Sequence, residues 1–214
     1  MSSASLGFSW EQFRAVPVVG ILRGFDGERI LRVLEAARRG GLTTVEITMD
    51  TPGAAALIAR ARSEFGTSLN LGAGTVISTA LLSEALGAGA QFVVTPALNA
   101  AVIERCRAVG VPIFPGAFSP TEILRAMEWG ASLVKVFPAE GLGPGFIRSV
   151  KMELPEARLM PTGGVDLTTL DEYREAGADG FGVGGPLFRK ERVQAGDWVW
   201  IEARCREWVS RFQV

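Results

Sequence analysis

The chain has 214 residues, 48% of them apolar, which is enough to bury a substantial core in one domain or, at most, a tight pair. Its 22 basic and 23 acidic residues leave a formal net charge of −1, which excludes the strongly basic composition typical of nucleic-acid or anionic-membrane binding. The absence of histidine excludes Ser-His-Asp and Cys-His catalysis and HExxH zinc sites. Any catalysis must therefore use carboxylates, lysine, arginine, hydroxyls or backbone amides.

The first residues and the two cysteines indicate a cellular compartment. Residues 1–13 contain no basic stretch followed by an apolar run, so we expect no signal peptide, and no apolar stretch reaches the length of a membrane span. Cys106 and Cys205 lie far apart and outside any CxxC motif, so we interpret both as buried thiols in a reducing compartment. We therefore predict a soluble cytoplasmic protein with no membrane partner.

In chain order, residues 5–14 are predicted to form a helix, and eight short apolar runs follow. Each run is too short for a helix and nearly continuous in apolar character, as in strands buried on both faces of a parallel sheet. The runs are 16–22, 43–49, 69–75, 91–96, 111–116, 133–138, 158–163 and 180–184. Helical periodicity fills the intervals. Residues 197–212, with Trp198, Trp200 and Trp208, are predicted to form a final amphipathic helix that serves as a docking or subunit surface.

Proline and glycine mark the predicted helix ends. Pro52 and Pro120 are expected at helix starts, because Thr51 and Ser119 before them are suitable N-caps. The helices are expected to end in glycine-containing turns, such as the one at Gly177. These signals recur once per strand–helix unit.

Eight strand–helix units predict an α/β fold of the (β/α)8 TIM-barrel type with an extra N-terminal helix, close to the lower size limit of that fold. The alternative is a doubly wound open sheet, which more often stops at five to seven strands. No linker or composition shift divides the chain, so we expect residues 1–214 to form a single (β/α)8 barrel domain. The active site of such a barrel lies at the carboxyl ends of its strands.

Lys135 is the strongest catalytic candidate, because it interrupts the apolar run 133–138 in a chain with only three lysines. Enclosure in a barrel lowers the pKa of an amine, which favours nucleophilic attack on a ketone. The alternative is a structural lysine at a strand end or paired with Glu46. Lys151 and Lys190 occupy segments that we interpret as solvated.

Glu46 is the second candidate, since it interrupts the apolar run 43–49. Beside Lys135 it could transfer a proton, with its pKa raised by apolar walls and balanced by the cation. The alternative is a purely structural pair of Glu46 with Lys135.

Paired glycines follow the last two predicted strands. Gly163–Gly164 and Gly184–Gly185 stand where barrels commonly bind a phosphate on backbone amides, which glycine lets approach closely. The GAGT motif at 72–75 likewise offers amides and a hydroxyl. The alternative is a set of tight turns in a chain with 26 glycines.

Seven motifs together resemble the class I 2-keto-3-deoxy-6-phosphogluconate (KDPG) aldolase family, which also includes 4-hydroxy-2-oxoglutarate (KHG) aldolase and the phosphogalactonate aldolase. The motifs are ILRG (21–24), VEIT (45–48), GAGT (72–75), VTP (94–96), PG (115–116), KVFPAE (135–140) and PTGGV (161–165). The resemblance covers about residues 16–187, most of the chain.

The resemblance implies a homotrimeric barrel and a Schiff-base aldolase with no metal or other cofactor, acting in carbohydrate metabolism of the Entner–Doudoroff type. By position, Lys135 would form the imine and Glu46 would move protons through water. Thr75 would bind the pyruvate carboxylate, and Pro96 and Phe137 would shape the pocket wall.

Arg23 and Thr162 match different branches of that family. Arg23 matches the arginine of ILRG, typical of the phosphogalactonate branch, and would hold the substrate carboxylate. Thr162 matches the phosphogluconate aldolases, whereas the phosphogalactonate branch carries valine there.

Two positions depart from the family pattern. Asp50 stands where phosphogluconate members often carry arginine, so carboxylate binding would fall to Arg23, Thr75 and backbone amides. Pro186 stands where a serine often follows the last pair of glycines, and proline supplies neither a hydroxyl nor an N–H to a phosphate.

These observations predict reversible cleavage of KDPG to pyruvate and glyceraldehyde 3-phosphate, whose phosphate the glycines Gly163, Gly164, Gly184 and Gly185 would bind. A KHG aldolase that releases pyruvate and glyoxylate, or a bifunctional enzyme, is the first alternative. A phosphate-binding barrel isomerase or epimerase and a non-catalytic metabolite-sensing barrel are the others. All four readings predict small-molecule ligands and no nucleic-acid partner.

Overall fold

The computed structural model describes residues 7–213, in which helices alternate with short parallel strands. The strands are β1 (Val18–Leu22), β2 (Thr44–Thr48), β3 (Asn70–Gly74), β4 (Val93–Val94), β5 (Ile113–Phe114), β6 (Gly116–Ala117), β7 (Val134–Val136), β8 (Leu159–Pro161) and β9 (Phe181–Val183). The helices are α1 (Trp10–Ala15), α2 (Gly27–Arg39), α3 (Ala54–Phe65), α4 (Thr79–Gly87), α5 (Ala100–Ala108), α6 (Pro120–Glu128), η1 (Ala139–Gly141, a 3-10 turn), α7 (Gly143–Glu153), α8 (Leu170–Glu175), α9 (Lys190–Gln194) and α10 (Trp198–Ser210).

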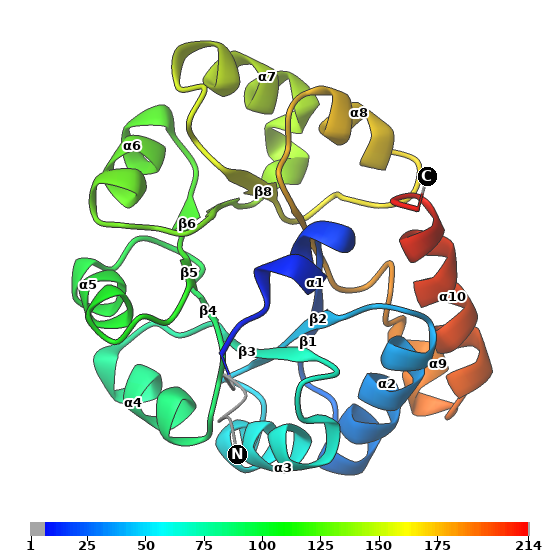
Figure 1. Ribbon diagram of the computed structural model, residues 1–214. Helices are drawn as coiled ribbons and strands as arrows, with labels where there is room; N and C mark the ends of the chain where they lie inside the picture. The colour runs from blue at the N-terminus through cyan, green and yellow to red at the C-terminus, as the bar shows by residue number, and fades with distance from the viewer. Residues whose placement is uncertain (1–6, 214) are drawn as a thin grey trace.

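The strands pair in two parallel sheets. Six strands follow the order β5-β4-β3-β2-β1-β9, and three follow the order β6-β7-β8. Figure 1 shows the strands around a common centre, with the helices other than α1 outside them. Strands that are consecutive in the chain are mostly neighbours in the sheet, which differs from the reversed order of a doubly wound fold.

The predicted α/β fold with parallel strands is confirmed, and every predicted apolar run contains a strand. The sheet, however, divides into six and three strands rather than forming one continuous ladder. The division between β5 and β6 falls at Pro115, which has no N–H to donate. The next amide, Gly116 N, donates to the Thr95 side chain at 3.4 Å, so the backbone ladder to β4 ends there.

Helix ends follow from capping side chains. The Asp26 carboxylate accepts a hydrogen bond from Arg29 N and starts α2, and Ser119 with Glu122 forms a capping box that starts α6. The prediction of a helix start at Pro52 is wrong. The Thr51 hydroxyl accepts from Gly24 N at 3.1 Å, in the loop after β1, and α3 begins only at Ala54.

The two terminal helices also differ from their predicted bounds. Residues 5 and 6 lie outside the described residues, and α1 begins at Trp10 because the Ser9 side chain caps it. In α10, Trp208 is fully buried, so it docks the helix onto this chain rather than onto another subunit. The docking is close: a Cβ atom at Gly40, at the end of α2, would lie 2.6 Å from Cys205 Cβ.

Both cysteines are buried, as predicted. Burial raises the pKa of Cys106 to about 11 and that of Cys205 to about 12, so neither is a ready nucleophile. Within residues 7–213, no helix is long and apolar enough to cross a membrane.

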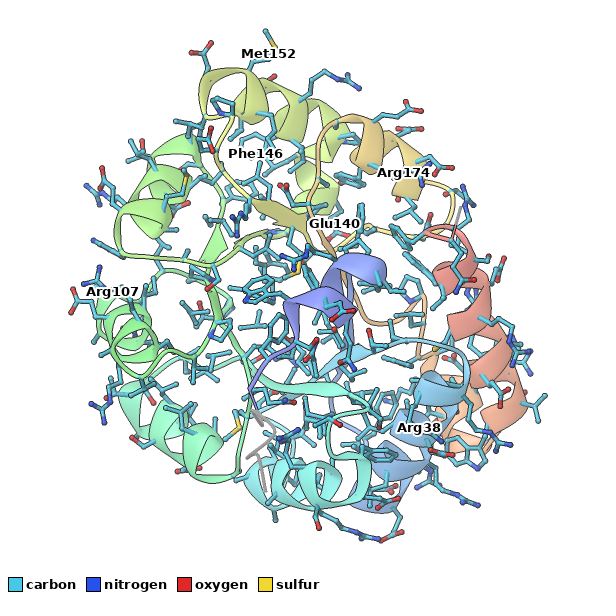
Figure 2. All side chains as sticks on the ribbon, viewed as in Figure 1. Arg38, Arg107, Glu140, Phe146, Met152 and Arg174 are labelled. Atoms are coloured by element: carbon cyan, nitrogen blue, oxygen red, sulfur yellow. The ribbon has the colours of Figure 1, made fainter. Side chains whose placement is uncertain are left out.

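An apolar cluster fills the interior at the amino ends of the strands. It contains the buried residues Phe13, Val19, Phe92, Val94, Phe114, Leu133 and Met160. The ring of Phe8 lies 5.3 Å from that of Phe92, and Figure 1 shows α1 across the centre of the ring of strands. Side chains occupy the space inside the ring, whereas Arg38, Arg107 and Met152 lie at the periphery (Figure 2). The amino end is therefore closed, and polar groups gather at the carboxyl end.

Candidate active site

Lys135 lies in the middle of β7 and is 8% exposed. Its Nζ stands 4.7 Å from the centre of the Phe137 ring. Burial lowers the pKa of Lys135, an effect that the Glu46 charge opposes and the Arg23 charge adds to. Among residues 7–213, no carboxylate forms an ion pair with Lys135, so the paired structural lysine is not what the structure shows. A buried amine without a counter-ion favours its neutral, nucleophilic form.

Glu46, in the centre of β2, is 1% exposed. Burial raises its pKa to about 7, although the charges of Lys135 and Arg23 pull the pKa down. Within the described residues its Oε2 has no hydrogen-bond partner. An unsatisfied buried carboxylate oxygen is costly, so this atom is available to hydrogen-bond with a bound molecule.

Gly74 at the end of β3 makes room for the Glu46 carboxyl group. A Cβ atom at Gly74 would stand 2.4 Å from Glu46 Oε1, closer than side-chain atoms approach one another. The GAGT motif therefore includes a glycine that the neighbouring strand requires. Sequence reasoning missed this role, because it depends on the pairing of β2 with β3.

Arg23, after β1, forms an ion pair with Asp50, after β2. Arg23 Nε and Nη2 donate to the same oxygen, Asp50 Oδ2, at 2.9 and 2.5 Å. The Arg23 charge acts on the pKa values of both Lys135 and Glu46, so the guanidinium lies near them. Asp50, which departs from the family pattern, thus holds Arg23, the residue that we expect to bind the substrate carboxylate.

Thr75 and Pro96 follow β3 and β4 at the same edge, and both are half-buried. Thr75 has φ 57°, a left-handed conformation that β-branched residues rarely adopt and that commonly occurs at functional sites. A Cβ at Gly116 would lie 2.2 Å from the Pro96 carbonyl oxygen, so position 116 requires glycine.

Thr162 continues β8 and is 4% exposed. It bridges to Gly182 of β9, where a Cβ would stand 2.2 Å from Thr162 Oγ1. Gly163 and Gly164 follow with φ of 87° and 73°. A turn of this kind needs glycine and exposes backbone amides.

Gly184 and Gly185 lie after β9, at the same edge of the sheet as Gly163 and Gly164. Neither has a positive φ. The Pro186 carbonyl oxygen, next in the chain, accepts a hydrogen bond from Arg204 Nε at 3.0 Å. The α10 helix thus braces this loop.

The other two lysines differ from Lys135. Lys190 is exposed, as predicted, but Lys151 is not solvated. Its side chain is only 20% exposed and its Nζ lies 2.7 Å from Asp179 Oδ2. Among the described residues, no group of three or more His, Cys, Asp or Glu side chains is arranged to hold a metal ion.

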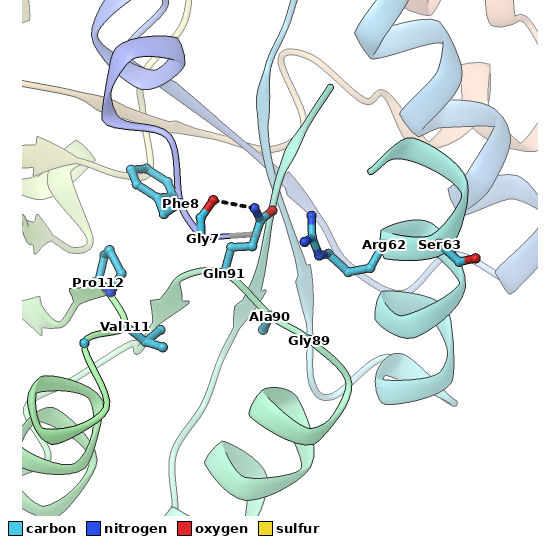
Figure 3. A pocket seen from close by; sticks show the side chains of 10 residues that line it. Gly7, Phe8, Arg62, Ser63, Gly89, Ala90, Gln91, Val111 and Pro112 are labelled. Carbon is cyan, nitrogen blue, oxygen red and sulfur yellow. Dashed lines mark hydrogen bonds between the residues drawn. The ribbon is translucent and has the colours of Figure 1, made fainter. Parts of the chain in front are cut away.

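The cavity in Figure 3 lies at the opposite end of the strands. Its volume is about 470 Å³, and it is bounded by the segments before β4 and β5 and by α3. Gln91 Nε2 donates to Gly7 O there at 2.8 Å, and Arg62 donates to Gly66 O at 2.7 Å. Its position away from Lys135 and Glu46 separates it from the candidate chemistry.

A buried amine and a buried carboxyl group of raised pKa, both within parallel α/β strands, are features of enzymes that act on carbonyl compounds. The model of the KDPG and KHG aldolase family matches residues 10–204, and the chain belongs to this family. It is an aldolase, an enzyme of the lyase class.

Relatives and solved structures agree with this assignment. The 2-dehydro-3-deoxy-phosphogluconate aldolase of Treponema pallidum is 43% identical over 164 residues, 76% of each chain. The aldolase of the same name from Pseudomonas aeruginosa is 38% identical over 201 residues, 93% of this chain and 89% of the relative. A KDPG aldolase from Legionella pneumophila, captured with pyruvate as a covalent carbinolamine, superposes with a TM-score of 0.86 at 26% identity, covering 92% and 95% of the two chains.

Proposed function

We propose that this enzyme is a Schiff-base aldolase that reversibly cleaves KDPG to pyruvate and glyceraldehyde 3-phosphate. The observation that carries the proposal is the burial of Lys135 without an ion-pair partner, close enough to Glu46 for each charge to act on the other's pKa. The names of the relatives from Treponema and Pseudomonas support the substrate.

The reaction begins when neutral Lys135 Nζ attacks the C2 ketone and forms a carbinolamine. Loss of water gives an iminium, which withdraws electrons from the C3–C4 bond. Glu46 removes the proton of the C4 hydroxyl, directly or through water, as that bond breaks and the aldehyde forms. The bond electrons produce an enamine, which takes up a proton at C3, and hydrolysis returns pyruvate and the free amine. A carboxyl group with a pKa of about 7 can both accept and donate these protons near neutral pH.

Substrate binding is assigned to the residues around this pair. Arg23, oriented by Asp50, and Thr75 bind the carboxylate so that the ketone faces Lys135. Two apolar residues, Pro96 and Phe137, form the pocket wall.

The aldehyde end of the substrate is assigned to β8 and β9. Thr162 faces the same edge, and the amides of Gly163, Gly164, Gly184 and Gly185 bind the phosphate. The positive φ values of the first two glycines support a backbone nest of this kind.

We further propose that the two sheets close into one (β/α)8 barrel, a single domain over residues 1–214. Two backbone hydrogen bonds and one β-bridge support closure. Ser132 N donates to Ile113 O at 2.9 Å, Asp179 N donates to Leu159 O at 2.8 Å, and Thr162 bridges to Gly182. These contacts join β5 to the start of β7, and β8 to β9.

The assembly and location follow the family resemblance. We propose a cytoplasmic homotrimer. Exposed apolar side chains, including Ile77 at 59% and Phe118 at 47%, are suited to a subunit contact. Sedimentation equilibrium tests the assembly, and a monomeric mass would contradict it.

Pro186 favours a second substrate, 4-hydroxy-2-oxoglutarate. Proline after Gly185 removes a hydroxyl and an N–H from the phosphate site, and cleavage to pyruvate and glyoxylate needs no phosphate. Comparison of kcat/KM for the two substrates separates the activities. A strong preference for hydroxyoxoglutarate would replace KDPG as the substrate.

Borohydride reduction in the presence of pyruvate tests the Schiff base. We expect a reduced pyruvyl adduct on Lys135, located by peptide mass spectrometry. The internal control is Lys151, whose Nζ forms an ion pair with Asp179 Oδ2 at 2.7 Å and on which we expect no adduct. Active protein without an adduct on Lys135 would favour an isomerase or epimerase, and unchanged biological activity of Lys135→Ala would favour a sensor.

A further inference from the structure

The Thr51 hydroxyl contacts the loop after β1 instead of capping the start of α3. Its side chain is only 3% exposed. Thr51 Oγ1 accepts a hydrogen bond from Gly24 N at 3.1 Å, and Gly24 directly follows Arg23 in the chain. The register of β1 and β2 ends with Leu22 opposite Ile47, so this bond joins the two loops beyond the end of the strand pairing.

Thr48, the last residue of β2, extends this contact toward Asp50. Its side chain is 1% exposed, and Thr48 Oγ1 lies 3.2 Å from Thr51 Oγ1. Burial acts to raise the pKa of Asp50, but hydrogen bonds from the side chains of Thr48 and Arg23 outweigh it and leave the pKa below its ordinary value. Asp50 therefore accepts from a buried hydroxyl as well as from the guanidinium.

These contacts close a ring of hydrogen bonds that begins and ends at Arg23. The Arg23 guanidinium donates to Asp50, and the amide of the next residue, Gly24, donates to Thr51. Because an amide N–H can only donate and an ionised carboxylate can only accept, both hydroxyl hydrogens point from Gly24 toward Asp50. The Thr51 hydroxyl thus donates to Thr48, and the Thr48 hydroxyl donates to Asp50. Hydrogen bonds arranged in this head-to-tail manner polarise and strengthen one another.

The ion pair alone holds Arg23 weakly. The side chains of Arg23 and Asp50 are 63% and 41% exposed, and water screens an ion pair between exposed groups. The two threonine hydroxyls, by contrast, belong to buried side chains. Gly24 has φ 71°, one of many backbone conformations that glycine permits, so the bond from its amide to Thr51 restricts the backbone beside Arg23.

We propose that Thr51 and Thr48 are positioning residues that fix both the backbone and the guanidinium of Arg23, and thereby set where the substrate carboxylate binds. The proposal rests on the proposed aldolase function, in which Arg23 binds that carboxylate. Both hydroxyls act through Arg23, so their loss weakens binding of the keto acid and leaves the chemistry at Lys135 in place.

A double-mutant cycle of Thr51→Val with Arg23→Ala tests the function of the ring. Valine removes the hydroxyl at nearly constant volume, and we expect KM for pyruvate in the condensation to rise about threefold to tenfold, as for one lost hydrogen bond, with kcat changed much less. Thr51→Ser keeps a hydroxyl and recovers most of the loss. In the Arg23→Ala background, Thr51→Val adds no further rise. An unchanged KM in Thr51→Val, or an equal rise with and without Arg23, would overturn the proposal.

Thr44→Val is the matched control, because Thr44 is a fully buried threonine at the other end of β2. Its hydroxyl accepts a hydrogen bond from Asn70 Nδ2 at 3.2 Å. We expect Thr44→Val to lose stability in urea denaturation, as Thr51→Val does, but to keep the wild-type KM for pyruvate. If both variants raised KM equally, loss of stability would account for the effect and the positioning role would be wrong.

Amide hydrogen exchange at Gly24, followed by NMR, tests the ring without an assay of activity. We expect this amide to exchange about tenfold faster in Thr51→Val than in wild type, and at the wild-type rate in Thr44→Val. Equal exchange in Thr51→Val and wild type would overturn the ring. If borohydride traps no pyruvate on Lys135 but exchange at Gly24 still depends on Thr51, the aldolase proposal fails and the ring at Arg23 stands.

Discussion

Burial of the Glu46 carboxyl group makes the stability of the protein depend on pH, in a direction that can be measured. The pKa of Glu46 is about 7 in the folded protein against an ordinary 4.5, so folding favours the neutral acid. This contribution to stability is complete below pH 4.5 and is lost as pH rises through 7. Above pH 7, the folded protein bears a buried carboxylate that costs on the order of 3 kcal/mol.

Glu46→Gln removes that cost. We expect the variant to gain free energy of unfolding relative to wild type as pH rises from 4.5 to 7, and the gain to level off above 7, in urea titrations at several pH values. Glu104→Gln, on the exposed face of α5, is the control and follows the wild-type curve. Parallel stability curves for Glu46→Gln and wild type would contradict the raised pKa.

Asp50 differs from other surface acids because its ion-pair partner, Arg23, is the residue that we propose binds the substrate carboxylate. Asp50→Asn releases the Arg23 guanidinium, so we expect KM for pyruvate in the condensation to rise about threefold to tenfold, with kcat changed much less, as for one weakened ionic contact. Asp26→Asn breaks the comparable exposed pair with Arg29 and serves as the control. An unchanged KM in Asp50→Asn, beside an impaired Arg23→Ala, would show that Arg23 needs no such support.

At the residue level, the sequence indicated a candidate where composition was unusual, and the structure buries that residue. Lys135 stands out because so few lysines occur and because this one interrupts an apolar run. Gly74 does not stand out, since glycine is common here. Its importance depends on its close approach to Glu46, which comes from another strand.

At the scale of elements, the pairing of β2 with β3 determines how much space the Glu46 carboxyl group has. Gly74→Ala places a methyl group against Glu46 Oε1. We expect the variant to lose most of its activity and about 1 to 3 kcal/mol of stability, as for an overpacked core. Steady-state kinetics and urea denaturation measure the two effects.

Gly87→Ala is the matched control, because Gly87 lies in α4 and a Cβ there meets nothing within 4 Å. We expect it to retain activity and to gain about 0.5 to 1 kcal/mol from helix propensity. If Gly74→Ala behaved like Gly87→Ala, the close approach of Gly74 to Glu46 would be irrelevant to function.

Element boundaries were predictable where a signal was local. The Asp26 cap and the Ser119 capping box act within one turn, and the α6 start was predicted. The predicted cap at Thr51 failed because its hydroxyl binds the loop after β1, a contact between distant segments. The division of the sheet at Pro115 likewise depends on where Gly116 finds its acceptor.

At the scale of the whole molecule, the order of strands along the sheets follows from the alternation of short apolar runs and helices. That alternation was visible in the sequence, and so was the edge at which the polar residues meet. The aromatic cluster beneath them was not, because Phe8 and Phe13, Phe92, and Phe114 come from three separate segments.

Within residues 7–213, this aromatic cluster closes the amino end of the ring of strands, so access to the site is from the carboxyl end. Substrate, hydrolytic water and both products must pass through the carboxyl end, because Phe13 and its neighbours close the other end. In the proposed reaction, cleavage of the C3–C4 bond forms the aldehyde before the imine is hydrolysed, so the aldehyde is released before pyruvate. In the reverse direction pyruvate binds before the aldehyde, and both pass through the same carboxyl end because apolar side chains fill the other.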